Sequence, residues 1–189
     1  MCFLTPPAEQ WRETFLQGAA EFHAEGRLDS TYAGFLGYTL RSLQVEFSRF
    51  IRDLNNLWDP SKLPSGWCPD RVLWLIDGEE YIGQISIRPE LGTTYLITYG
   101  GHIGYSIRPS KRRRGYGQKI LAMALAEARK LGLASVLVTC DSDNTASRKI
   151  IERNGGRFES ALKMVPKIAR AEGRQTESPV QKMRYWIQL

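Results

Sequence analysis

The chain has 189 residues, of which 42% are hydrophobic and 24% charged, proportions typical of one soluble globular domain covering residues 1–189. No apolar run approaches the roughly 20 residues that a membrane-spanning helix needs, and the N-terminus lacks the basic and apolar regions of a signal peptide. The net charge of +6 favours an acidic partner, which coenzyme A or nucleic acid would each provide.

The three cysteines, Cys2, Cys68 and Cys140, are an odd number without C-x-x-C spacing. They indicate reduced thiols in a cytoplasmic protein rather than a disulfide framework. The two histidines have no paired-ligand spacing either, so we expect no metal site.

The N-terminal third is predicted to be mainly helical. After a short edge strand at residues 2–4, apolar residues at helical spacing predict a helix over residues 8–24, which Gly26 would end. A second pattern of the same kind predicts one helix over residues 38–57, closed by aspartate and prolines.

Strand patterns dominate the middle of the chain. Two β-rich runs, residues 71–76 and 81–88, flank an Asp-Gly pair and therefore predict a hairpin. A link rich in glycine and threonine, residues 91–101, leads into a strand over residues 102–108.

The rest of the chain alternates helices and strands. A helix with an apolar face from Ile120 to Leu131 precedes a nearly continuous apolar run, residues 135–139, the pattern of a buried central strand. Further predicted elements are a helix capped by Asp143 or Asn144 and ending near residue 154, a strand from residue 157, an excursion or long hairpin arm over residues 161–179, and a final strand over residues 181–189. Because a crossover helix joins the strands at 102–108 and 135–139, these two should be parallel and most other neighbours antiparallel.

The most informative stretch is IRPSKRRRGYG, residues 107–117, which joins a strand to a long helix. The first amides of a helix have no intrahelical partner, and the helix dipole places partial positive charge at the same end. Gly115 and Gly117 would let the backbone turn tightly and approach a ligand. These features favour a phosphate-binding turn, although a basic run is also commonly a solvated surface.

Two motifs resemble those of a known family. R-x-x-G-x-G (Arg112, Gly115, Gly117), after a strand ending in Ile-Arg-Pro, resembles the acyl-CoA signature of the GNAT N-acetyltransferases. DSDNTASRKIIERNGGRFE, residues 141–159, resembles the family's next strand-helix-strand unit, in which Asn144 and Ser147 would lie beside the cofactor. The phrases RPELG, GGHIGYSIRPS, TCDSDN and RYWI are similar to a poorly characterised bacterial branch of predicted acetyltransferases.

The resemblance implies the GNAT acyl-CoA N-acyltransferase fold, an α/β architecture with a mixed sheet. Its sheet is mostly antiparallel, is splayed between two central parallel strands, and is flanked by helices. It also implies acetyl transfer from acetyl-CoA to a primary amine of a small molecule or protein, by direct attack in a ternary complex. The residues that would bind the cofactor are Ser106, Ile107, Arg112, Arg113, Arg114, Gly115, Tyr116, Gly117, Gln118, Asn144 and Ser147.

Within that set, the resemblance assigns the pyrophosphate to the amides of residues 112–118, and the pantetheine arm to Ser106 and Ile107. A backbone N–H at a strand bulge near Ser106 or Ile107 would stabilise the anionic thioester oxygen. The first two helices and their connection would wall the acceptor site, and segments 26–38 and 57–67 are where its specificity would be set.

Proton transfer is less well specified. A lysine-like amine has a pKa about three units above neutral pH, so its deprotonation costs roughly 4 kcal/mol and a general base is expected. His102 is the candidate, with Glu80, Tyr99 and Tyr105 weaker; alternatively, His102 only bonds a neighbouring backbone group. Many family members carry a proton-donating Tyr where this chain has Ile151. Ser147 is the nearest hydroxyl on that helix, and because the CoA thiol is a good leaving group, water would suffice to protonate it.

Two other functions are compatible with the sequence. One is a catalytically silent acyl-CoA-binding GNAT domain that acts as a sensor or interaction module. The other is nucleic-acid binding, which we disfavour because the basic run 111–114 is short and has no aromatic stacking platform beyond Tyr116. The sequence is also compatible with a homodimer.

Overall fold

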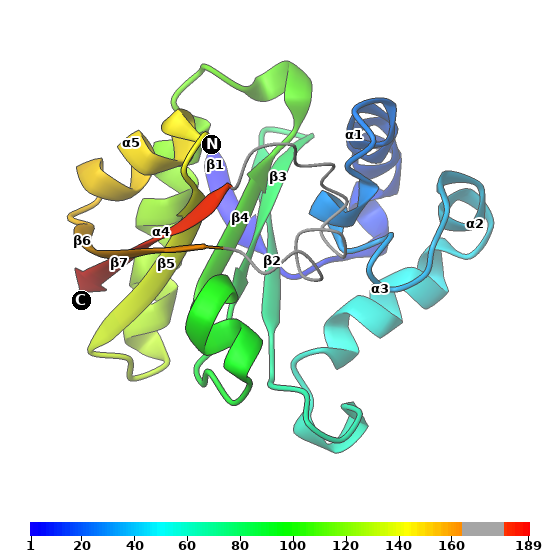
Figure 1. Ribbon diagram of the computed structural model, residues 1–189. Helices are drawn as coiled ribbons and strands as arrows, with labels where there is room; N and C mark the ends of the chain where they lie inside the picture. Colours follow the sequence, from blue (N-terminus) through cyan, green and yellow to red (C-terminus); the bar gives the residue numbers. More distant parts are fainter. Residues whose placement is uncertain (164–179) are drawn as a thin grey trace.

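The computed structural model of the chain describes residues 1–163 and 180–189. Within them, a seven-stranded sheet with the order β1-β2-β3-β4-β5-β7-β6 runs through the middle of the molecule, and helices cover both faces (Figure 1). The strands are β1 (Cys2–Thr5), β2 (Arg71–Asp77), β3 (Glu80–Ile87), β4 (Ile103–Ile107), β5 (Ser135–Asp141), β6 (Arg157–Lys163) and β7 (Gln181–Gln188). The α-helices are α1 (Arg12–Ala24), α2 (Leu40–Val45), α3 (Phe47–Asn56), α4 (Tyr116–Lys130) and α5 (Thr145–Arg153).

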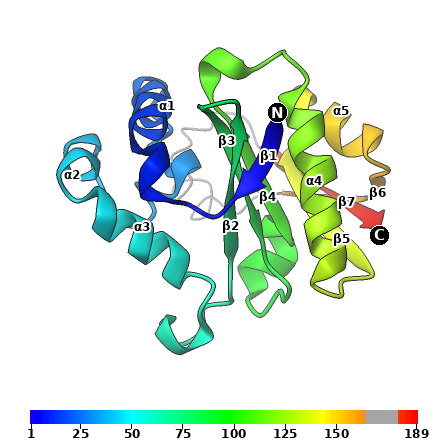
Figure 2. The ribbon, with the colours of Figure 1, turned by 180° about the vertical axis from the view of Figure 1, so that it is seen from behind.

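Helices α1, α2 and α3 cover one face of the sheet, and α4, with α5 beside it, covers the face turned to the viewer in Figure 2. Strand β2 shows how the two faces are built, because successive side chains of a strand point to opposite sides. Trp74 and Ile76 pack with the aromatic residues of α1 and α3, whereas Leu73 and Leu75 pack with α4. All four are buried, which explains the continuous apolar run of this strand.

The sheet is antiparallel except at its centre, where β4 and β5 run parallel, as the crossover predicts. The parallel pairing consists of one register position, Ile103 opposite Val138. On its other side β4 stays paired with β3, from Ile103 opposite Ile87 to Ile107 opposite Gly83. Beyond Ile103, therefore, the β5-facing edge of β4 has no strand partner.

The predicted single helix over residues 38–57 is wrong, because α2 and α3 are separate helices that meet at Glu46. Glu46 has φ −112° and ψ 31°, outside the helical region. The break changes the direction of the chain, so that α2 packs on α1 while α3 packs on β2. A straight helix could not reach both.

The other predicted strands and helices are present, with ends shifted by a few residues. The link over 91–101 contains a turn of π-helix (Leu96–Gly100) that the sequence pattern did not predict. Of the arm expected over residues 161–179, residues 161–163 belong to β6 and the remainder lies outside the described residues. No helix in the described segments has the length and apolar character needed to cross a bilayer.

Candidate active site

The gap between β4 and β5 opens into a cleft with a volume of about 740 Å³. This lies within the roughly 300–1,000 Å³ of typical small-molecule sites. Its walls come from the short helical turn Leu28–Thr31, from β3 and β4, from the basic loop, from the first turn of α4, and from α5 along its length.

The backbone of β4 presents alternate residues to the gap. The carbonyl of His102 accepts from the amide of Arg88 (2.8 Å), and the amide of Arg108 donates to the carbonyl of Ile82 (2.8 Å). Even-numbered residues of β4 therefore direct their backbone polar groups toward β3. The backbone groups of Tyr105 and Ile107 face the opening instead.

Ser106, expected to pair with the pantetheine arm, directs its backbone toward β3, and its hydroxyl donates to the carbonyl of Ser30 (2.7 Å). Ile107, the other expected residue, does face the gap. The expected bulge near these two residues is not present, because the register between β3 and β4 is continuous. The two central strands thus separate while β4 remains regular.

The N-terminus of α4 offers free backbone donors. Gly115 precedes the helix with φ +82°, a conformation that favours glycine. The amides of residues 113–117 donate to no acceptor in the described part of the chain. A Cβ on Gly117 would lie 2.5 Å from Cδ1 of Ile150, so this glycine lets α4 approach α5 closely. The predicted phosphate-binding turn therefore has the required geometry.

The basic loop is less free than its sequence suggests. Arg112 forms a bidentate ion pair with Glu25, with both N–O distances 2.8 Å, and its Nε donates to the carbonyl of Ile107 (3.0 Å). Lys111 pairs with Glu80 at 2.6 Å. Arg113 lines the cleft and forms no ion pair with the described residues. Arg112 thus holds the shape of the loop, and Arg113 contributes the uncompensated charge.

Helix α5 closes the other side of the cleft. Asn144 caps it by accepting from the amide of Ser147 (3.0 Å), so the expected pair forms a helix cap, and both residues line the cleft. Gln118 also lines the cleft. Tyr116 does not, because its hydroxyl donates to the Asp77 carboxylate (2.7 Å) and ties α4 to the end of β2. Arg114 is likewise absent from the cleft wall.

Tyr105 spans the gap from β4 toward α5. Its hydroxyl lies 3.5 Å from the carbonyl of Ser147, at the limit of a hydrogen bond, and its side chain lines the cleft. Burial raises the pKa of Tyr105 to about 12, so the hydroxyl keeps its proton at neutral pH. Ile151, one turn beyond Ser147, is buried in the core.

His102 lies next to the cleft but does not line it. Its Nδ1 accepts a hydrogen bond from the amide of Leu137 (2.9 Å), so the ring proton of the neutral imidazole is on Nε2. A protonated Nε2 has no lone pair with which to accept a proton from the substrate. Burial and, secondarily, the charge of Arg88 lower the pKa of His102. This geometry favours a structural role between β4 and β5. Neither Glu80 nor Tyr99 lines the cleft.

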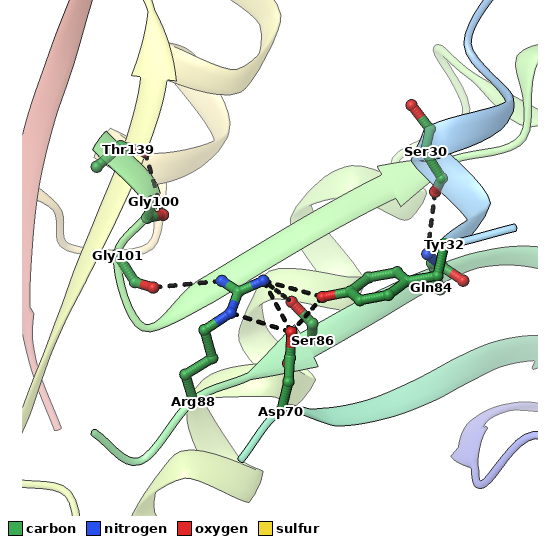
Figure 3. A network of polar contacts seen from close by, with 9 residues as sticks. All are labelled: Ser30, Tyr32, Asp70, Gln84, Ser86, Arg88, Gly100, Gly101 and Thr139. Atoms are coloured by element: carbon green, nitrogen blue, oxygen red, sulfur yellow. Dashed lines mark hydrogen bonds and ion pairs between the residues drawn. The ribbon is translucent and has the colours of Figure 1, made fainter. Parts of the chain in front are cut away.

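Tyr32, Ser86 and Arg88 line the cleft where β3 ends and β4 begins, away from the start of α4, and they belong to a polar network (Figure 3). Arg88 donates to the Asp70 carboxylate (3.0 Å), to the hydroxyl of Tyr32 (2.9 Å) and to the carbonyl of Gly101 (3.3 Å), while the Tyr32 hydroxyl donates to Asp70. Burial opposes the charge on Arg88, but Tyr32 and Asp70 outweigh it and raise the pKa of the guanidinium. Tyr32 has φ +65°, unusual for a residue with a side chain.

Sequence reasoning missed this network, since no short motif contains it. The predicted hairpin did contain a signal for the ion pair. Pairing residues outward from the Asp-Gly turn places Asp70 near Arg88 at the end of the hairpin away from the turn. The irregularity between Leu75 and Ile76 brings the two residues opposite each other. Tyr32 comes from the segment 26–38, where we expected specificity residues.

The sequence matches the family model of the acetyltransferase (GNAT) domain over residues 12–157. The chain belongs to the GNAT acetyltransferase family. A search of the curated proteins found no match.

Solved structures of GNAT acetyltransferases share its fold. The microcin C7 self-immunity acetyltransferase MccE, in complex with acetyl-CoA and AMP, is 14% identical with a TM-score of 0.66, covering 100% of this chain and 92% of its own. The Salmonella typhimurium acetyltransferase that modifies the N-terminal serine of ribosomal protein L7/L12 is 17% identical with a TM-score of 0.64, covering 100% and 95%. A chimera of Vibrio cholerae spermidine N-acetyltransferase and hSSAT is 13% identical with a TM-score of 0.61, covering 99% and 95%.

Proposed function

We propose that this GNAT protein is a cytoplasmic N-acetyltransferase that moves an acetyl group from acetyl-CoA to a primary amine by direct attack in a ternary complex. One observation supports this most strongly. The gap-facing backbone of β4 and the unpaired amides at the start of α4 open into the same cleft. An extended ligand with a phosphate at one end fits that combination.

Binding would be shared among three parts of the cleft. The amides of residues 113–117 and the side chain of Arg113 would hold the pyrophosphate, each charge-assisted bond contributing roughly 1.5–3 kcal/mol. The backbone groups of Tyr105 and Ile107 would pair with the pantetheine arm as an added strand would. Lys149 and Arg153 also line the cleft and add positive charge beside α5.

Bound acetyl-CoA supplies an activated acetyl thioester whose thiol is a good leaving group. The amide of Tyr105 or Ile107 would donate a hydrogen bond where negative charge develops on the acyl oxygen. The hydroxyl of Tyr105 holds a proton in the same gap and is our candidate for the group that protonates the departing sulfur. It would take the role of the tyrosine that many family members carry at the position of Ile151.

The incoming amine must lose a proton at a cost of roughly 4 kcal/mol. His102 has its basic nitrogen engaged by Leu137. Among the described residues that line the cleft, Asp29 is the one carboxylate, and we assign it the base role, acting directly or through water.

Gly115→Glu tests the cofactor site. We expect it to abolish coenzyme A binding in calorimetry, because bulk and negative charge would occupy the anion site. Gly132→Glu is the matched control, since Gly132 has the same φ of +82° and the same open surroundings at the other end of α4. Unchanged affinity in the Gly115 variant would refute the assignment.

Catalysis is tested separately with a panel of amines, following free thiol. Saturable thiol release that depends on the amine supports the enzyme. Acetyl-CoA binding without turnover on any amine would instead support the non-catalytic acyl-CoA-binding domain.

A further inference from the structure

Two large aromatic side chains are exposed on the surface beside the cleft. Phe35 is 55% exposed and Trp67 is 44% exposed, and their ring centroids lie 5.2 Å apart. Phe35 comes from the segment between α1 and α2, and Trp67 from the link between α3 and β2. Two segments distant in sequence thus combine to present one aromatic surface to solvent, and such a surface commonly marks a binding site.

This surface is continuous with the part of the cleft that Tyr32 lines. The ring of Phe35 contacts the ring of Tyr32 edge-on, with centroids 5.8 Å apart. Tyr32 lines the cleft, and its hydroxyl is held by both Asp70 and Arg88 (Figure 3). The contact therefore links the outer aromatic pair to a tyrosine whose position is fixed from inside.

Charge on the cleft wall does not suit a polycation. Asp29 is the one carboxylate among the described residues that line the cleft, and Asp70, which does not line it, is already neutralised by Arg88. Arg27, which also lines the cleft, adds positive charge. An acceptor with several ammonium groups would have no cluster of carboxylates to bind its further charges.

We infer that the acceptor is a monoamine attached to a flat aromatic group, which lies on Phe35 and Trp67 while the amine reaches past Tyr32 into the cleft. The inference rests on the proposed function and narrows its substrate class. Aromatic side chains bury large areas and stack favourably on other rings, whereas an unbranched aliphatic chain gains less from the same surface.

The test compares 2-phenylethylamine with butylamine and spermidine, using kcat/KM for thiol release at saturating acetyl-CoA. We expect 2-phenylethylamine to be preferred over either by about tenfold or more. Phe35→Ala and Trp67→Ala should each remove most of this preference while leaving the KM for acetyl-CoA unchanged. Phe158→Ala is the matched control, because Phe158 is an equally exposed phenylalanine (56%) on β6, away from the cleft, and should change nothing.

Calorimetric titration of 2-phenylethylamine into the coenzyme A complex gives a readout independent of turnover. If Phe35→Ala weakens this binding and Phe158→Ala does not, the aromatic site is supported. That holds even if no amine is acetylated, because a lack of acetylation would count against the proposed enzyme activity and not against the binding site. Equal use of the three amines, a preference for spermidine, or binding of 2-phenylethylamine that is absent or unaffected by Phe35→Ala would overturn the inference.

Discussion

The ion pair between Asp70 and Arg88 should contribute far more to stability than a surface pair of the same length. Its N–O distance is 2.9 Å, and its arginine and aspartate side chains are 16% and 11% exposed. The pair between Arg49 and Glu46 has the same 2.9 Å distance, but its side chains are 63% and 41% exposed. The two pairs have the same length and differ in burial, which makes Glu46→Gln a control for Asp70→Asn.

Asp70→Asn preserves the shape of the side chain and removes its charge, leaving the buried guanidinium of Arg88 uncompensated. Breaking a buried pair in this way costs about 3 kcal/mol or more. Water already solvates the exposed pair, so Glu46→Gln should cost about 0.5 kcal/mol or less. For a domain of this size, each kcal/mol lowers Tm by roughly 2–4 °C, so we expect falls of about 6–12 °C and about 2 °C or less, respectively.

Thermal unfolding followed by circular dichroism at pH 7 measures both shifts. The double variant Asp70→Asn with Arg88→Met should recover much of the loss, because replacing both partners leaves no unpaired buried charge. Equal shifts for Asp70→Asn and Glu46→Gln, or no recovery in the double variant, would refute this reasoning. The first result would mean that Tyr32 and Gly101 alone satisfy the guanidinium.

Two further predictions concern Tyr105 and His102, the side chains in and beside the cleft that carry a proton. Tyr105→Phe should lower kcat by about 100-fold with the KM for acetyl-CoA unchanged, and Tyr99→Phe should leave kcat alone; an unaffected kcat in the first variant would assign the proton to water. The folded protein holds the pKa of His102 below its ordinary value of 6.5, so the stability of the fold should decrease as the pH drops below that value. His102→Gln should reduce the decrease in Tm measured between pH 7 and pH 5. The same variant should retain kcat; a loss of 100-fold or more would restore His102 as the base.

Much of the fold follows from patterns within short stretches of sequence. The alternation and the Asp-Gly turn predict the hairpin of β2 and β3, and apolar spacing predicts α4 and α5. The glycine at position 115 predicts the tight turn before α4, and its φ of +82° is one at which a side chain would be strained. The prediction of one helix in place of α2 and α3 was wrong because the apolar spacing continues through Glu46 and gives no sign of a break. The chain bends there because α2 and α3 pack on different partners.

The turn before α4, which we propose binds an anion, was visible in the sequence because neighbouring residues build it from backbone groups. The roles of individual side chains depend on partners far along the chain, as when Arg112 meets Glu25 and Tyr32 meets Asp70. His102 could be read as a base until the structure placed the amide of Leu137 against its Nδ1. Local periodicity and turn chemistry act over a few residues and so can be recognised in the amino-acid order, whereas charge pairing, tautomer and access to the cleft arise once the sheet brings distant segments together.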